Sequence, residues 1–258
     1  MENEKENITQ RSVSQNNHIS GSLINGAYYE GRDLEVLSHL PNYYNWIIEI
    51  FRPKLRGHVV EVGSGIGTIA EMILPEVTSL ELIEPSKHLT DLFSESLKGS
   101  SKVEVVNASI EQRLPRIGES SVDAVVMVNV LEHVERDKEA IDLLYRVLKR
   151  DGHLLLFVPA LAFLFSELDK VHGHLRRYSK KSLEKLVNDS GFEIELSRYF
   201  DFSGIIPWWL INKVFKQTSF NPRIAQAYDS YIIPFTKFFE TRVSPPLGKN
   251  IILIARRV

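Results

Sequence analysis

The stretch "VVEVGSGIGTIAEMIL", residues 59–74, constrains the fold more than any other part of the chain. An apolar run carries a carboxylate at Glu61, passes through Gly63, Gly65 and Gly67, and continues with apolar residues at helical spacing. A buried strand, a glycine-rich turn and a helix in this order are typical of the first unit of a doubly wound α/β sheet. The glycines allow the main chain to approach a ligand at the carboxyl end of that strand.

Strands and amphipathic helices alternate through the rest of the chain. Short apolar runs predict strands at residues 58–63, 79–86, 102–109, 121–130, 153–160, 192–201 and 250–258. Helical spacing predicts helices at 33–51 (interrupted near Pro41), 68–77, 88–97, 138–152 and 181–191, the last with Ser179 as N-cap and Gly191 after its end. This order predicts an α/β, Rossmann-like, doubly wound sheet of seven mostly parallel strands, with helices on both faces and an antiparallel last strand.

The domain organisation is simple. Residues 1–22 are polar and predicted to be a disordered tail, and residues 23–258 are predicted to form one domain. Within it, residues 202–248 are rich in aromatic side chains and predict a helical insertion that covers the substrate. Its helices are predicted to break at Pro207, Pro222 and Pro234.

Composition excludes several classes of protein. The 31 basic and 33 acidic residues give a net charge of −2, so no global field attracts nucleic acid. The absence of cysteine excludes disulfides and cysteine-based zinc sites. The first twenty residues lack the apolar core of a signal peptide, and the apolar runs are shorter than the ~20 residues of a membrane-spanning helix. We therefore expect a cytoplasmic protein.

The glycine turn is compatible with two ligands. A dinucleotide site has the pattern G-x-G-x-x-G, but Thr68 stands at the third glycine position, and Glu61 is poorly placed for an anionic pyrophosphate. A carboxylate there suits a cationic group such as an α-ammonium. Glu84 follows Gly63 by 21 residues and can accept from ribose hydroxyls, while Asn107 ends the third strand and can meet a purine edge. A nicotinamide-dependent oxidoreductase stays an alternative, but it leaves Thr68 and Glu61 unexplained.

The segments "EVGSGIG", "LIEPS", "NAS" and "VDAVVMVNVLEHV" resemble, in order and spacing, the class I S-adenosylmethionine-dependent methyltransferases over roughly residues 55–160. The resemblance implies S-adenosylmethionine as the cofactor and methyl transfer to an oxygen or nitrogen of a small-molecule acceptor, such as a natural product, sugar or lipid-like molecule. It implies that the loop after Glu61 holds the methionine part, Glu84 the ribose, and Asn107 with Ala108 the adenine. The implied cofactor-binding residues are Glu61, Gly63, Ser64, Gly65, Gly67, Glu84, Pro85, Ser86, Asn107, Ala108, Asn129 and Leu131.

Histidines after the fourth and fifth strands are the candidate catalytic bases, because imidazole titrates near neutral pH. His133 is a candidate base or a structural cap of the next helix. A metal is not expected, since relatives that bind one use E-x-x-E-H and Asn129 occupies its first position. His172 and His174 belong to a D-x-x-x-G-H-x-R-R-Y run similar to one in small-molecule methyltransferases. Of the two, His174 is expected to deprotonate the acceptor.

The candidate substrate-binding residues are Tyr44, Arg176, Arg177, Tyr178, Trp208 and Trp209. The arginines can clamp an anionic group on the acceptor, and the aromatic residues can cover it. Structural alternatives are a solvated basic loop and aromatic side chains that bury one another. The basic cluster at 176–181 also leaves open an RNA or protein methyltransferase, although we expect no nucleic-acid partner. The apolar segment 204–215 suits a transient contact with a membrane surface.

Overall fold

The computed structural model describes residues 22–24, 27–29, 34 and 38–258. The predicted tail, residues 1–22, lies outside these residues except for Ser22, and the first part of the predicted helix 33–51 lies outside them as well. An antiparallel pair of short strands, β1 (Ser22–Ile24) and β2 (Ala27–Tyr29), precedes the main domain and was not predicted. The first long helix is α2 (Pro41–Phe51), which begins at the proline expected to interrupt it.

The main sheet has seven strands in the order β5-β4-β3-β6-β7-β9-β8. The strands are β3 (His58–Val62), β4 (Ser79–Ile83), β5 (Val103–Val106), β6 (Val122–Val128), β7 (Leu148–Pro159), β8 (Phe192–Phe200) and β9 (Asn250–Arg257). Strands β3 to β7 pair in parallel, whereas β9 pairs antiparallel with both β7 and β8. The predicted Rossmann-like fold is therefore confirmed, with the last strand inserted between β7 and β8.

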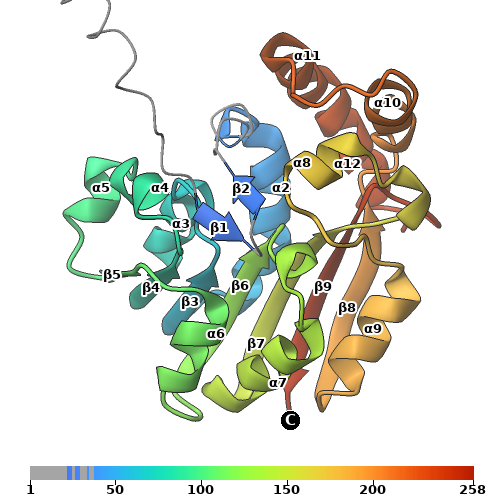
Figure 1. The fold of residues 1–258 in the computed structure, drawn as a ribbon. Helices are drawn as coiled ribbons and strands as arrows, with labels where there is room; N and C mark the ends of the chain where they lie inside the picture. The colour runs from blue at the N-terminus through green and yellow to red at the C-terminus, as the bar shows by residue number, and fades with distance from the viewer. Residues whose placement is uncertain (1–21, 25–26, 30–33, 35–37) are drawn as a thin grey trace, which may run out of the picture.

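Helices cover both faces of this sheet (Figure 1). One core contains Trp46 and Phe51 of α2, Ile73 of α3 (Thr68–Ile73) and Leu97 of α5 (Glu95–Lys98). The other core contains side chains of α6 (Ile110–Arg113), α7 (Asp137–Val147) and α9 (Lys180–Asn188). Strands with apolar residues on both faces need this double cover, which leaves the carboxyl ends of the parallel strands as the natural ligand edge.

Two predicted helices are shorter than expected. The predicted helix 88–97 is split into α4 (Lys87–Asp91) and α5, because the hydroxyl of Ser94 accepts from the Leu97 amide and starts a new helix. The predicted helix 138–152 ends at Val147, and Leu148 instead pairs with Val122 of β6. The strand continues from there, but its register with β6 shifts before pairing resumes between His153 and Ala124. Helical spacing did not reveal this change because Val147 and Leu148 are both fully buried.

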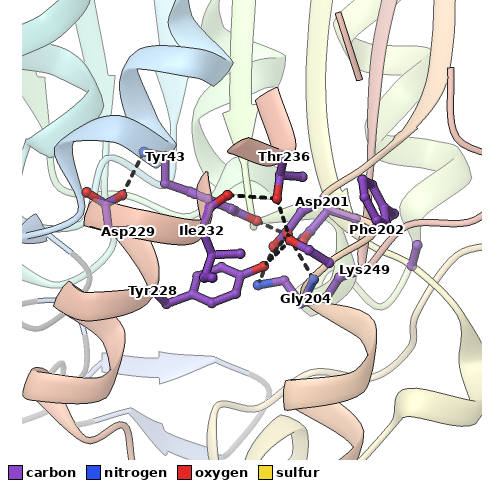
Figure 2. Close-up of polar contacts among 12 residues, drawn as sticks. Tyr43, Asp201, Phe202, Gly204, Tyr228, Asp229, Ile232, Thr236 and Lys249 are labelled. Carbon is purple, nitrogen blue, oxygen red and sulfur yellow. Dashed lines mark hydrogen bonds and ion pairs between the residues drawn. The ribbon is translucent and has the colours of Figure 1, made fainter. Parts of the chain in front are cut away.

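The insertion between β8 and β9 forms two continuous helical segments. The first joins α10 (Ile205–Trp208) to a π-helical turn (Trp209–Val214). The second joins α11 (Pro222–Ala227), a π-helical turn (Tyr228–Ile232) and α12 (Ile233–Glu240). The prediction of a break at Pro234 is wrong, because the wider π turn just before it accommodates a residue without an amide hydrogen. The hydroxyl of Thr236 donates to the Ile232 carbonyl nearby (Figure 2).

Two buried aspartates fasten this insertion to the domain. Asp229 accepts from the backbone amides of Asn42 (3.1 Å) and Tyr43 (2.8 Å), and so caps α2, whose own N-cap Leu40 has no side-chain acceptor. Asp201, fully buried at the end of β8, accepts from Tyr228 of the insertion and lies 3.1 Å from the Lys249 ammonium (Figure 2). Two neighbouring residues of the insertion, Tyr228 and Asp229, are therefore held to the domain by charged or charge-assisted contacts.

Candidate active site

A cavity of about 810 Å³ lies at the carboxyl edge of the sheet. One part of its wall comes from the turn after β3, from Glu84 after β4 and from Ala108 after β5. Another part comes from residues after β6 and from the loop between α8 (Glu167–Val171) and α9. The insertion closes the cavity with residues such as Trp208 and Tyr228, at the end of the sheet where Figure 1 shows α10 and α11. The volume of the cavity is sufficient for a nucleoside-sized ligand together with a second molecule.

The Glu61 carboxylate faces this cavity at the end of β3 and is nearly fully buried. Its Oε2 atom has no hydrogen-bond partner among the described residues, and neither has the buried hydroxyl of Ser64. Burial, and then the nearby charge of Glu84, raises the pKa of Glu61 well above its usual range. A buried acceptor without a donor costs free energy, and a ligand that supplies a cationic donor here would remove that cost. An α-amino acid group fits that requirement.

The three glycines of the turn serve different purposes, although all have positive φ angles. A side chain on Gly63 would lie 2.5 Å from Val130, and one on Gly67 would lie 2.5 Å from Leu97, so both positions serve close packing. Among the described residues, a side chain on Gly65 would meet Leu34 alone, at 3.3 Å, and would otherwise occupy the cavity. Gly65 therefore provides the ligand space, and Gly67 lies outside the cavity wall.

The Glu84 carboxylate is held in place by the backbone. Its two oxygens accept from the amides of Gly65 and Ser86, each at 3.0 Å, and the side chain also lines the cavity. Each carboxylate oxygen accepts more than one hydrogen bond, so ribose hydroxyls can still be bound. Ser86 itself caps α4 and lies outside the cavity wall. Asn107, predicted to meet the adenine, instead donates to the Glu84 carbonyl at 3.2 Å and to Thr90 at 3.0 Å.

All three candidate histidines line the cavity, and two of them are in contact. His133 lies in the 3₁₀ turn Leu131–His133, and its ring centre is 4.8 Å from that of His174. Burial, and then the proximity of His174, lowers the pKa of His133 to about 3. Burial also lowers the pKa of His174, against the opposing effect of a 2.8 Å contact between its Nδ1 and Asp169. His172 is the third member, with its ring centre 5.8 Å from that of His174.

Two acidic residues lie beside these histidines: Glu132, which sequence reasoning considered only as a ligand of an unexpected metal, and Asp169, which it missed. Glu132 is completely buried, and neither of its carboxylate oxygens accepts a hydrogen bond from another described residue. Burial raises the pKa of Glu132 to about 8. Asp169 is also completely buried; burial alone would raise its pKa, but the hydrogen bond from His174 and the charge of Arg177 lower it to about 2. Asp169 is the first residue of the D-x-x-x-G-H-x-R-R-Y run, and its position in that run could have identified it from the sequence.

The arginines and the tyrosine of that run have structural contacts. Arg177 borders the cavity, but its guanidinium donates to both oxygens of Asp169 and to the Ala160 carbonyl. Few of its N–H groups therefore remain to bind an anionic group of the acceptor. Arg176 pairs with Asp137 at 2.7 Å, and the Tyr178 hydroxyl donates to the same carboxylate at 2.8 Å. Both lie outside the cavity wall, contrary to the sequence expectation.

Of five further predicted residues, three line the cavity and two do not. Asn129 lines the cavity with a φ of 54°, whereas Leu131 is fully buried in the core and does not line it. Trp208 lines the cavity and donates its indole N–H to the Leu164 carbonyl, while its neighbour Trp209 lies outside the wall and is partly exposed. Tyr44 lines the cavity from α2, as expected of a residue that covers the ligand.

Comparisons with known proteins agree with this geometry. A family model described as a methyltransferase domain matches residues 35–197. A putative methyltransferase from Bacillus halodurans has a similar fold, with 19% identity, a TM-score of 0.57, and coverage of 83% of this chain and 98% of that one. A Haemonchus contortus phosphoethanolamine N-methyltransferase, solved in complex with S-adenosylmethionine, shares 16% identity at a TM-score of 0.58 and covers 87% of this chain and 57% of that one.

A curated relative, the probable polyketide synthase 40 of Dictyostelium discoideum, is 24% identical over 130 residues. That match spans 43% of this chain but only 5% of the relative. The family model covers more than half of the 258 residues, and the fold and the acidic glycine turn agree with it. The alternative of a nicotinamide-dependent oxidoreductase is thereby rejected, and methyl transfer is the reaction class. The chain belongs to the methyltransferase domain family and has the fold of the class I S-adenosylmethionine-dependent methyltransferases.

Proposed function

We propose that the protein methylates an oxygen or nitrogen atom of a small, largely apolar acceptor bound beneath the insertion. The observation that carries this proposal is that Glu61, whose Oε2 has no hydrogen-bond partner among the described residues, and the three histidines line one cavity. Bound S-adenosylmethionine supplies an electrophilic methyl group, so the protein must chiefly orient the acceptor and exclude water. The match to polyketide synthases supports an acceptor of the natural-product or lipid-like class.

Different residues of the cavity bind the cofactor and activate the acceptor. Glu61 binds the α-ammonium group, the backbone-held Glu84 binds the ribose, and Gly65 leaves the space between them. At the other side, His133 and His174 border the place where an acceptor loses its proton. Trp208 and further apolar side chains of the insertion exclude water from the cavity. A substrate covered in this way must be small enough to fit beside the cofactor in this cavity.

The proposal is tested by following a labelled methyl group. The full-length protein is incubated with S-adenosylmethionine carrying a tritiated methyl group and a cell extract, and the products are separated into an organic phase, RNA and protein. We expect the label in low-molecular-weight material, mainly in the organic phase. Label confined to RNA or protein would overturn the small-molecule acceptor and favour the alternative methyltransferase classes.

His174→Ala is expected to separate turnover from cofactor binding. The imidazole borders the acceptor side of the cavity and has no contact with Glu61 or Glu84, so we expect kcat to fall by about 10²- to 10⁴-fold. The affinity for S-adenosylhomocysteine, measured by calorimetry, should change less than about twofold. Full turnover in this variant would remove His174 from the mechanism.

We also propose that the insertion contacts an anionic membrane surface, which would give access to a lipid-like acceptor. Apolar side chains that are at least 60% exposed gather on it: Ile206, Phe215, Tyr231, Phe235 and Val243. Its exposed charges are all basic, as in Lys216, Arg223 and Arg242, because its two acidic residues, Asp229 and Glu240, are buried. Basic charge beside exposed aromatic residues is typical of segments that lie in the lipid headgroup region. Within the described part of the chain, no helix combines the length and apolarity needed to cross a bilayer.

This contact predicts co-sedimentation with vesicles that contain phosphatidylglycerol and much weaker co-sedimentation with pure phosphatidylcholine. Replacing both Ile206 and Tyr231 with serine should weaken binding roughly tenfold, because two exposed apolar anchors are lost. Phe163→Ser is the matched control, since Phe163 is 54% exposed but lies outside the insertion. Absence of binding to anionic vesicles at low salt would contradict the proposal.

A further inference from the structure

Three potential metal ligands converge beside the cavity. One ligand atom each from Glu132, His133 and His174 lies within 4.8 Å of the other two. The first two residues belong to the 3₁₀ turn after β6, and the third comes from the loop after α8. The sequence expectation of no metal considered only the pattern around Asn129 and could not include His174, which becomes a neighbour only in the folded chain.

Both histidines are oriented through their Nδ1 atoms. His174 Nδ1 lies 2.8 Å from Asp169, whose carboxylate is fixed in turn by Arg177 and by the amide and hydroxyl of Ser166. His133 Nδ1 lies 3.3 Å from the Gly173 carbonyl. Carboxylates and carbonyls accept hydrogen bonds, so each Nδ1 carries the proton, and a histidine in this tautomer binds a metal through Nε2. Histidines that bind metals are held in this way by a carboxylate or a carbonyl behind them.

The Glu132 carboxylate lies beside both histidines and has no proton donor among the described residues. It is 0% exposed, and neither oxygen accepts a hydrogen bond from another described residue. Its Oε1 atom lies 3.8 Å from His174 Nε2, which is too long for a hydrogen bond. Two metal bonds of about 2.1 Å each can span that separation. A buried carboxylate in this position costs free energy unless a cation compensates it.

We propose that Glu132, His133 and His174 bind one divalent transition-metal ion, of the Zn²⁺ or Mn²⁺ type. Two imidazoles and one carboxylate match the donor preferences of these ions better than those of Mg²⁺ or Ca²⁺. Both histidines line the cavity, so the remaining coordination positions are open to water or to an acceptor oxygen. Metal binding at this site is inferred from the geometry alone. A role of the bound metal in activating the acceptor rests on the proposed function.

Zn²⁺ titration of the full-length, chelator-treated protein tests this site. Calorimetry should give one ion per chain, and Co²⁺ in its place should give visible absorption bands of a site with mixed nitrogen and oxygen ligands. Glu132→Gln and His174→Gln should each weaken Zn²⁺ binding at least about 100-fold. Asp169→Asn, which acts only through His174, should weaken it by about 10- to 100-fold. His172→Gln is the matched control and should bind Zn²⁺ like the unmodified protein.

Melting curves without metal show whether each variant folds, and S-adenosylhomocysteine binding is measured in parallel. Substoichiometric Zn²⁺ binding, or binding unchanged in both Glu132→Gln and His174→Gln, would overturn the site and leave an Asp169–His174 pair acting as a base. Metal binding without binding of S-adenosylhomocysteine would contradict the proposed function but not the metal site. The two inferences can therefore fail separately.

Discussion

Replacing Glu61 with glutamine is expected to weaken the binding of S-adenosylmethionine by roughly 30-fold, equivalent to about 2 kcal/mol for one charge-assisted hydrogen bond. The carboxylate is buried at the cavity wall, and its Oε2 has no partner among the described residues, so the ligand's ammonium group is its natural donor. Glutamine has nearly the same shape but no charge. Isothermal calorimetry with S-adenosylmethionine measures the loss directly.

A ligand without the amino acid group provides the control. Methylthioadenosine keeps the ribose and adenine but lacks the ammonium, so its affinity should be nearly the same for the unmodified protein and for Glu61→Gln. Glu84→Gln should weaken both ligands, because the ribose is common to them. Equal losses of both ligands in Glu61→Gln would place the ammonium elsewhere in the cavity.

The same carboxylate predicts a pH dependence of cofactor binding. Burial, and then Glu84, raises the pKa of Glu61 in the free protein well above its usual range, whereas a bound ammonium group favours the ionised form. Binding therefore releases a proton wherever Glu61 is protonated beforehand, and affinity should increase with pH until the free carboxyl is ionised. The affinity should be measured below about pH 7.5, where the ligand's ammonium stays protonated. In Glu61→Gln this increase should be much smaller.

Replacing Asp201 with asparagine is expected to lower the free energy of unfolding by about 3 kcal/mol or more. Asp201 is fully buried, accepts from the Tyr228 hydroxyl and the Gly204 amide, and lies 3.1 Å from the Lys249 ammonium. Removing its charge leaves the mostly buried Lys249 ammonium without its carboxylate partner. Asparagine tolerates the φ of 61° at this position, so the backbone adds little to the loss.

Urea unfolding followed by tryptophan fluorescence measures this change, since Trp208 and Trp209 lie in the insertion that Asp201 holds. Asp189→Asn is the matched control: it removes one partner of an exposed pair with Lys185 and should cost less than about 0.5 kcal/mol. A loss below about 1 kcal/mol in Asp201→Asn would mean that the contacts in Figure 2 do not anchor the insertion.

Local patterns in the chain were sufficient for the sheet and for the cofactor end of the site. Alternation of apolar strands and amphipathic helices determines a parallel sheet, and the carboxyl ends of its strands must share one edge. Glu61 lies near the carboxyl end of β3, Gly65 is in the turn after it, and Glu84 directly follows β4, so the position of each on that edge could be predicted from the sequence alone. For Asn107 and Leu131 the position beside the edge was right, but the side chains turn to the backbone of β4 and to the core.

The acceptor end depended on contacts between segments that are distant in the chain. Glu132 meets His174, and Asp169 holds both His174 and Arg177, only because the loop after α8 folds over the turn after β6. Burial and hydrogen-bond partners decide whether a charged side chain binds a ligand or supports a neighbour, and neither is encoded in residue spacing. The sequence by itself therefore determined the fold, the family and the cofactor edge. Tertiary structure alone decided which buried acidic groups are paired inside the protein and which, like Glu61 and Glu132, have carboxylate oxygens without a hydrogen-bond partner among the described residues.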